Sequence, residues 1–289
     1  MNKLLLTGST GFVGSVLLPR LARKFQVYAI VRGYPKKKIQ KVIYIKINLF
    51  DEKKVFSLLK KERFKNLIHL AWEARPKIFW NSKNNINFFH ASTNLYYNFC
   101  KFGGKFAILA GSSAECNLRN KIVDEKEVDL KFKFSEYSIS KYLFMRNVKK
   151  ISNIFKSDFA WARLFWIYGK NQPYGKLISD MTQHIKQKKN FVIQNKNDSI
   201  NLMNIEDAAS SLFMLLRFRV KGIVNVASKN NCKLFEIISM IKNNDIRNKI
   251  ILRNKNKLYL FKKIIVNKLK SIGFKEKFNI KNEINSLQK

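Results

Sequence analysis

The stretch "LLLTGSTGFVGSVLL", residues 4–18, decides the fold. A short leucine-rich run with the character of a buried strand comes first, and a helical pattern follows the glycines. Gly8, Gly11 and Gly14 have the spacing G-x-x-G-x-x-G. Glycines at a strand-to-helix turn let the backbone approach a pyrophosphate closely, and the helix N-terminus offers free N–H groups to that anion. The stretch therefore predicts a dinucleotide-binding turn.

The first half of the chain alternates short β-rich runs with longer helical patterns. This alternation predicts βαβ units and a parallel sheet covered by helices on both faces, an α/β fold of the doubly wound Rossmann type. The expected strands are Lys3–Leu6, Gln26–Arg32, Val42–Ile47, Asn66–Leu70, Lys105–Ala110 and Phe159–Phe165, and the expected helices are Phe12–Lys24, Glu52–Arg63, Ser82–Phe102 and Ser135–Phe155.

The second half predicts a smaller substrate lobe that is not contiguous in sequence. We expect a dinucleotide-binding domain over 1–169 that is rejoined by 198–228, and a lobe made of 170–197 and 229–289. Segments 175–188, 205–219 and 233–243 have helical patterns, and Ile223–Ala227 is typical of a strand. The region 245–289 is basic and mixed, and its elements cannot be assigned from the sequence.

Composition narrows the class of protein. The net charge of +38 could indicate a nucleic-acid or membrane-surface partner, but the basic residues are scattered and no nucleic-acid-binding motif occurs. No apolar run reaches the roughly 20 residues that span a bilayer. Three cysteines and three histidines lack metal-site or disulfide-framework spacing. We therefore expect a cytoplasmic protein with no metal, no nucleic-acid partner and no integral membrane segment.

The end of the second expected strand bears on which dinucleotide binds. An NAD-binding unit usually carries an acidic residue there, bonded to the ribose 2′-hydroxyl. Residues 1–50 contain no Asp or Glu, and this strand ends in Arg32. Because arginine can hold a 2′-phosphate through charge-assisted hydrogen bonds, the sequence favours NADP(H), with NAD(H) as the alternative.

A tyrosine and a lysine four residues apart can form a proton-transfer pair. On a helix they share one face, and a nearby cation helps a phenol to exchange protons near neutral pH. Four such pairs occur, so the spacing alone selects none. Tyr137–Lys141 combines a helical setting with a serine at a strand end, Ser113, 24 residues upstream. The other pairs are Tyr34–Lys38, Tyr97–Lys101 and Tyr259–Lys263.

Further segments extend this pattern along nearly the whole chain. They are "TGSTGFVG" (7–14), "LIHLAW" (67–72), "GSSAE" (111–115), "YSISK" (137–141), "ARLFWIYG" (162–169), "NIEDAASSL" (204–212), "GIVNVAS" (222–228) and "LKSIGF" (269–274). With these segments in this order, the chain resembles the extended short-chain dehydrogenase/reductases, in the NAD-dependent epimerase/dehydratase family that acts on nucleotide sugars.

The resemblance implies a catalytic triad of Ser113, Tyr137 and Lys141. Tyr137 would donate the proton, Ser113 would orient the substrate oxygen, and Lys141 would lower the tyrosine's pKa and hold the nicotinamide ribose. For Glu115, a loop carboxylate is as consistent as a sugar contact. The implied substrate-binding residues are Trp72, Ser112, Ser113, Glu115 and Trp166, and the expected cofactor-binding residues are Gly8, Thr10, Gly11, Phe12, Val13, Gly14, Arg32, Asn48, Leu49, Leu70, Ala71, Lys141 and Phe165.

Within the family, "HLAWEARP…FW" and "GSSAE" are most similar to reductases of nucleotide-linked 4-keto-6-deoxy sugars. Three positions depart from the family pattern. Ala114 stands where dehydratases of the family have the aspartate of an acidic pair, so dehydration is disfavoured. Trp166 stands where the family commonly has an asparagine after the sixth strand. The family's arginine that contacts the nucleotide phosphate falls near Ile200, so this contact is missing here.

The leading hypothesis is an NADP(H)-dependent reductase of a nucleotide-linked keto sugar, in cell-surface or secondary-metabolite sugar biosynthesis. One alternative is a nucleotide-sugar 4-epimerase with tightly bound NAD. Another, from a different class, is a non-catalytic dinucleotide sensor. By analogy with the family, we expect a homodimer formed through the helices near 82–102 and 135–155.

Overall fold

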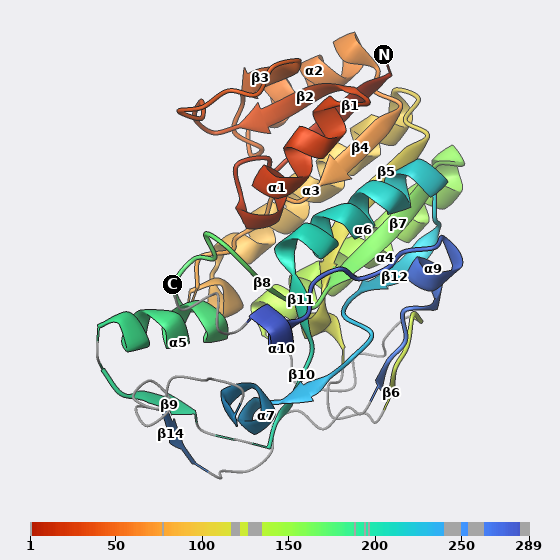
Figure 1. Ribbon diagram of the computed structural model, residues 1–289. Helices are drawn as coiled ribbons and strands as arrows, with labels where there is room; N and C mark the ends of the chain where they lie inside the picture. Colours follow the sequence, from red (N-terminus) through yellow and green to blue (C-terminus); the bar gives the residue numbers. More distant parts are fainter. Residues whose placement is uncertain are drawn as a thin grey trace.

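The computed structural model describes residues 2–76, 78–116, 122–126, 135–187, 189–193, 195, 197–239, 250–253 and 263–283. Its centre is a seven-stranded parallel sheet (Figure 1). The strands are β1 (Lys3–Thr7), β2 (Gln26–Val31), β3 (Val42–Lys46), β4 (Asn66–His69), β5 (Phe106–Ser112), β7 (Asp158–Leu164) and β12 (Gly222–Val226), in the spatial order β12-β7-β5-β4-β1-β2-β3. This order reverses between β1 and β4, which is where doubly wound sheets bind ligands.

Helices cover both faces of the sheet because successive strand side chains point to opposite sides. On β1, Leu4 and Leu6 join one buried cluster, whereas Leu5 joins the other. The first cluster packs against α1 (Phe12–Ala22), α6 (Ile205–Phe218) and α9 (Asn267–Ser271), and the second against α2 (Glu52–Glu62), α3 (Asn84–Lys101) and α4 (Glu136–Phe155).

Local capping explains where several helices begin and end. Asp51, Ser135 and Asn204 precede α2, α4 and α6, and each side chain accepts a hydrogen bond from a backbone N–H of the first turn. Such caps satisfy donors that the helix itself leaves open. Arg63 and Lys156 end α2 and α4 in the left-handed conformation.

A smaller group of elements lies beyond the carboxyl ends of the strands (Figure 1). Its core joins buried residues such as Tyr168, Ile178, Met181 and Ile237. Its elements and the short pairs beside them are β8 (Trp166–Tyr168) with β11 (Leu202–Asn204), α5 (Leu177–Lys186), β9 (Phe191–Ile193) with β14 (Ile250–Leu252), β10 (Ser199–Ile200) with β13 (Cys232–Lys233), α7 (Leu234–Ser239), α10 (Ile280–Glu283), and β6 (Ile122–Val123) with β15 (Lys263–Ile264).

The α/β fold with a doubly wound parallel sheet, expected from the sequence, is confirmed. All six strands and four helices expected before residue 170 form, with ends that differ by a few residues. The expected helix 233–243 is observed as Leu234–Ser239; Lys233 ends β13, and residues 240–243 lie outside the described part of the chain. Within the described ranges, no helix combines the length and apolarity needed to cross a membrane.

Candidate active site

The glycine turn lies at the carboxyl end of β1, against the segment that follows β4. Gly8 has φ +75°, and a Cβ built there would lie 2.7 Å from the Ala71 backbone nitrogen. A side chain at position 8 would therefore clash as well as strain the backbone. The Ala71 N–H also donates to Thr7 Oγ1 at 3.3 Å, so the ends of β1 and β4 are joined beside the turn.

The start of α1 packs closely on the glycine turn and carries no negative charge. A Cβ at Gly14 would lie 2.0 Å from the Gly8 carbonyl oxygen, so only glycine permits this close packing of helix on turn. Gly11 begins the helix without a side-chain cap, and the first helical turn carries no acidic residue. Ser9 Oγ is buried in the same turn and lacks a hydrogen-bond partner within the described chain. Open N–H donors at a positive helix end and an unpaired hydroxyl fit a pyrophosphate.

The other residues expected to bind a cofactor lie along the same edge. Leu70 follows β4, and its N–H donates to the Thr7 carbonyl at 3.2 Å. Arg32 is exposed at the end of β2, and Phe165 is buried at the end of β7. Asn48 is exposed and Leu49 is half-buried just after β3, while Thr10 is exposed in the glycine turn and Phe12 and Val13 are half-buried in the first turn of α1.

Tyr137 and Lys141 lie in the first turns of α4, packed against the end of β5. Lys141 is buried, and its Nζ donates to the Ala110 carbonyl at 2.8 Å. The same ammonium lies 3.7 Å from the centre of the Trp72 ring and 6.0 Å from that of the Tyr137 ring. The helical i, i+4 spacing thus puts both groups at the carboxyl edge of the sheet, as expected from the sequence.

Burial governs the charges of this pair. It raises the pKa of Tyr137 to about 12, against a hydrogen bond with Ser112 that lowers it, and the Glu115 carboxylate raises it further. Burial also lowers the pKa of Lys141, which Glu115 partly offsets. Desolvation is the largest influence on the pKa of Tyr137 in this arrangement, and the lowering of that pKa by Lys141, expected from the sequence, stays a prediction. Tyr137 is therefore a protonated phenol, a proton donor, at neutral pH.

The two serines at the end of β5 differ in their contacts. Ser112 interacts with Tyr137, and its Oγ also accepts the Ala114 N–H at 3.2 Å. Ser113 begins the short 3-10 turn Ser113–Glu115 and is half-buried. The hydroxyl that contacts the tyrosine is thus the first serine, whereas Ser113, the expected catalytic hydroxyl, lies next to it.

Glu115 points into the protein. It is 1% exposed, its Oε1 accepts the Ser112 N–H at 2.6 Å, and its Oε2 accepts the Trp161 indole N–H at 2.8 Å. Arg163 Nε lies 3.9 Å from Oε2, while the guanidinium donates to the carbonyls of Asp124 and Lys126. Of the two roles that the sequence left open for Glu115, this geometry favours the structural carboxylate.

Two aromatic side chains that the sequence did not associate with the site pack against Tyr137. Phe79 and Trp80 meet the Tyr137 ring edge-on, at centroid distances of 4.9 and 5.9 Å. Lys176, just before α5, lies 4.6 Å from the Phe79 ring centre, and burial lowers its pKa. The "FW" pair was visible in the sequence, but nothing there places it against Tyr137. Trp166, an expected substrate contact, is half-buried in β8 and packs against Phe165.

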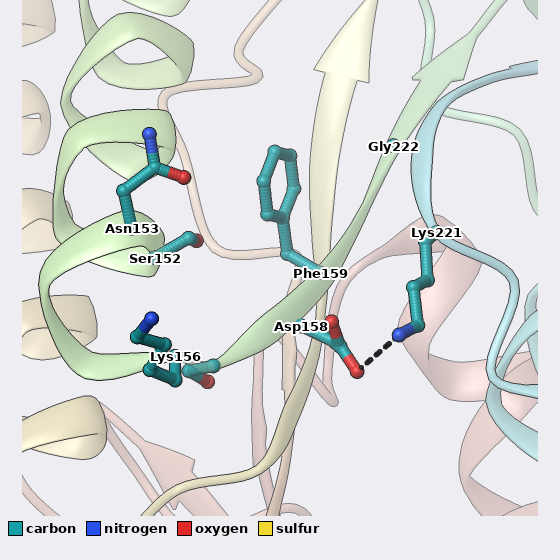
Figure 2. A pocket seen from close by; sticks show the side chains of 8 residues that line it. Ser152, Asn153, Lys156, Asp158, Phe159, Lys221 and Gly222 are labelled. Carbon is teal, nitrogen blue, oxygen red and sulfur yellow. Dashed lines mark ion pairs between the residues drawn. The ribbon is translucent and has the colours of Figure 1, made fainter.

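A pocket of about 490 Å³ lies at the opposite edge of the sheet (Figure 2). It is lined by the end of α4 and the starts of β7 and β12, the amino ends of these strands. Its Lys221 is paired with Asp158 at 2.8 Å, so this cation is already partly neutralised. Because it is separated from the glycine turn and Tyr137 by the length of the strands, we assign it no part in their chemistry.

Comparison with known proteins agrees with this geometry. The sequence profile of the NAD-dependent epimerase/dehydratase family matches residues 4–227. The chain belongs to that family, and it is an NAD(P)-dependent enzyme of the extended short-chain dehydrogenase/reductase type. A search of curated protein sequences found no match.

Solved structures of similar fold cover nearly the whole chain. The UDP-glucose 4-epimerase of Thermotoga maritima, solved with UDP-glucose, has a TM-score of 0.81 at 16% identity over 99% of this chain and 96% of its own. The UDP-N-acetylglucosamine 4-epimerase of Methanobrevibacter ruminantium has a TM-score of 0.78 at 20% identity over 99% and 96%. The UDP-glucuronic acid 4-epimerase of Bacillus cereus, solved with NAD, has a TM-score of 0.80 at 16% identity over 99% and 100%.

Proposed function

We propose that this chain is an NAD(H)-dependent 4-epimerase of a nucleotide-linked sugar. The carrying observation is the placement of Tyr137 and Lys141 at the carboxyl edge of the sheet, beside a glycine turn shaped for a pyrophosphate. The similarity to three nucleotide-sugar 4-epimerases over nearly the full length favours epimerisation over the reductase that the sequence suggested first.

Each residue has a distinct part in this proposal. The turn from Gly8 to Gly14 would hold the pyrophosphate, and Leu70, Ala71, Lys141 and Phe165 would line the nicotinamide end. Arg32, Asn48 and Leu49 would lie along the adenosine end. When bound, the nicotinamide would take up and return the hydride of the sugar carbon.

Tyr137 would transfer the proton of the reacting sugar hydroxyl. The oxidation half of an epimerisation needs Tyr137 as a phenolate, a form that the positive charge of a bound oxidised nicotinamide would favour. The phenolate oxygen would accept the proton of the sugar hydroxyl while the carbonyl forms, and the resulting phenol would return it when the carbonyl is reduced from the other face. Ser113 would orient the substrate oxygen. Lys176, a half-buried cation close to the Phe79 ring, is suited to the diphosphate of a sugar nucleotide.

A second candidate is the NADPH-dependent reductase of a nucleotide-linked keto sugar. Two observations favour it. Arg32 is exposed at the end of β2, where it could hold a 2′-phosphate, and the raised pKa of Tyr137, about 12, keeps the phenol protonated for a reduction. A reductase consumes one cofactor molecule per turnover, whereas an epimerase consumes none.

This difference defines the experiment. The purified protein is analysed by mass spectrometry for its bound dinucleotide and then incubated with UDP-hexoses without added cofactor. Catalytic conversion to the 4-epimer, with copurified NAD(H), supports the proposal. Stoichiometric NADPH oxidation with a 4-keto-6-deoxy sugar nucleotide, and no epimer, would replace it with the reductase. Dinucleotide binding without turnover of either substrate would favour a sensor.

We also propose a homodimer through α3 and α4, which pack against each other along the chain's outer surface. Ile86 and Tyr97 on α3, and Leu143 and Ile154 on α4, are exposed and recur at an 11-residue spacing that keeps each pair on one helix face. Light scattering should give twice the monomer mass, and Leu143→Glu should give the monomer. A monomeric wild type would contradict this.

A further inference from the structure

Trp72 is held rigidly between β4 and α3. Its Nε1 donates to Asn85 Oδ1 at 3.0 Å, and the fully buried Asn85 donates through Nδ2 to the Phe79 carbonyl at 2.7 Å. The Trp72 ring also stacks on Phe88, with centroids 5.7 Å apart. Since its one hydrogen-bond donor is used inside the protein, the polar edge of this indole is not available to a sugar.

The face of Trp72 is occupied as well. The Lys141 ammonium lies 3.7 Å from the ring centre, well inside the range of a cation–π contact, in a site where Lys141 is only 2% exposed. A desolvated ammonium needs such partners to remain charged. The second contact of Lys141, to the Ala110 carbonyl, fixes the same atom from the end of β5.

We propose that Trp72 is a positioning residue for Lys141, holding its ammonium at the end of β5 and favouring its charged form, rather than the substrate contact expected from the sequence. The catalytic consequence rests on the proposed function, whereas the contact itself does not. Phe79 links Trp72 to Tyr137. Its carbonyl oxygen accepts a hydrogen bond from Asn85, which also bonds Trp72, and its ring lies edge-on against the Tyr137 ring.

Other ionisable groups around Lys141 also influence its protonation. Glu115 favours the charged lysine, and the buried His69, from β4, is coupled to it electrostatically. Tyr137 lies one helical turn away, and Arg163, from β7, faces the same Glu115. Replacing only residue 72 leaves these groups in the chain, and Trp72→Phe, which loses the hydrogen bond to Asn85 but keeps a π face, controls for the loss of that bond.

The first test uses the cofactor-free protein. Lysine labelled with ¹³C at Cε is titrated by NMR, and the Lys141 resonance is identified by its loss in Lys141→Arg. Trp72→Leu should lower the titration midpoint of Lys141 by about 0.5–1.5 pH units, and Trp72→Phe by much less, because phenylalanine keeps a π face. Trp80→Leu removes a neighbouring indole over which none of the described lysines lies, and it should leave the midpoint unchanged.

An unchanged Lys141 midpoint in Trp72→Leu would overturn the proposal. If that variant does not fold, biosynthetic incorporation of fluorinated tryptophan weakens the ring's π face at nearly constant shape, and it should lower the midpoint in the wild type but not in Trp72→Phe.

The second test separates positioning from substrate binding. For a positioning residue, Trp72→Leu should lower kcat about tenfold with KM nearly constant, and Trp72→Phe should restore most of kcat. A raised KM with an unaltered kcat and an unaltered Lys141 titration would make Trp72 a substrate contact. If Lys141 titrates as expected while the wild type converts no nucleotide sugar, the proposed function fails and the role of Trp72 in holding Lys141 stands.

Discussion

At the residue scale, burial is the dominant influence on the candidate catalytic groups. It raises the pKa of Tyr137 and lowers that of Lys141, so it favours the neutral form of both. Lys141 remains anchored through its Ala110 and Trp72 contacts. Without a bound cofactor, the pair therefore combines a protonated phenol with a fixed lysine, and an epimerase would need the phenolate form of Tyr137 for the oxidation half of its reaction.

The two serines can be separated by a matched pair of variants. Ser113→Ala should lower kcat about 100-fold if its hydroxyl orients the reacting oxygen, because a lost donor at a developing charge costs that order of magnitude. Ser112→Ala loses the contact to Tyr137 and a turn-stabilising bond, and it should lower kcat less. Steady-state kinetics decides, and the reverse ranking would assign the orienting hydroxyl to Ser112.

His69 makes a prediction about stability. It bonds Thr7 Oγ1 through Nδ1 and Ser92 Oγ through Nε2, and burial, aided by the charge of Lys141, lowers its pKa to about 3. The unfolded chain binds a proton near pH 6.5, whereas the folded chain does not. The free energy of unfolding should therefore fall as pH drops from about 6.5 toward 3, by up to about 1.4 kcal/mol per pH unit from this group.

The measurement compares denaturant unfolding of the wild type and His69→Gln between pH 7 and 4. Glutamine can bond both hydroxyls but does not titrate, so the wild type should lose stability more steeply on acidification. Parallel pH dependences in the two proteins would contradict a buried neutral His69.

Residue contacts were the least predictable feature of the site. The i, i+4 spacing and Ser113 were sufficient to single out Tyr137–Lys141. The contact of Lys141 with Trp72 depends on how β4 and α4 pack, and Glu115 could equally have faced substrate or interior. Side-chain partners that are distant in sequence leave no periodic signal, which is why Phe79 and Lys176 were also missed.

At the element scale, the glycine turn is the feature whose structure depends most directly on the residue types in the sequence. Gly14 packs α1 onto the turn so closely that an added methyl group would lie 2.0 Å from the Gly8 carbonyl. Gly14→Ala should cost about 1–3 kcal/mol of stability through overpacking and weaken dinucleotide binding. Gly33→Ala is the control, since a methyl group there meets nothing within 4 Å. Denaturant unfolding measures the stability of both variants, and titration measures their dinucleotide affinity. Equal stabilities and equal affinities of Gly14→Ala and Gly33→Ala would contradict the tight packing at Gly14.

The elements themselves were predictable to different degrees. Strands of the central sheet carry long apolar runs, and their flanking helices have clear periodicity and caps such as Asp51 and Ser135. Apart from β12, the described strands after residue 165 are only two or three residues long, and several pair with distant segments, as β9 does with β14. Such short pairs have too few residues for an alternation to be recognised, so the elements after residue 245 were not assigned.

At the scale of the whole molecule, the parallel sheet collects the ends of five chain segments at one edge. The glycine turn follows β1, Leu70 and Ala71 follow β4, the serines end β5, Phe165 follows β7, and α4 adds Tyr137 and Lys141. Fold class and family could be predicted from motif order because these ends are fixed by topology. The reaction could not, because the set of Ser113, Tyr137 and Lys141 would serve the chemistry of an epimerase or of a reductase alike.

The most direct test of the account compares the wild type with Tyr137→Phe on UDP-hexoses, with conversion followed by NMR. The wild type should interconvert the 4-epimers. Tyr137→Phe should be slower by at least about 100-fold, because the proton has no acceptor or donor, while its dinucleotide affinity stays within a few-fold. Wild-type turnover by Tyr137→Phe would contradict the central claim.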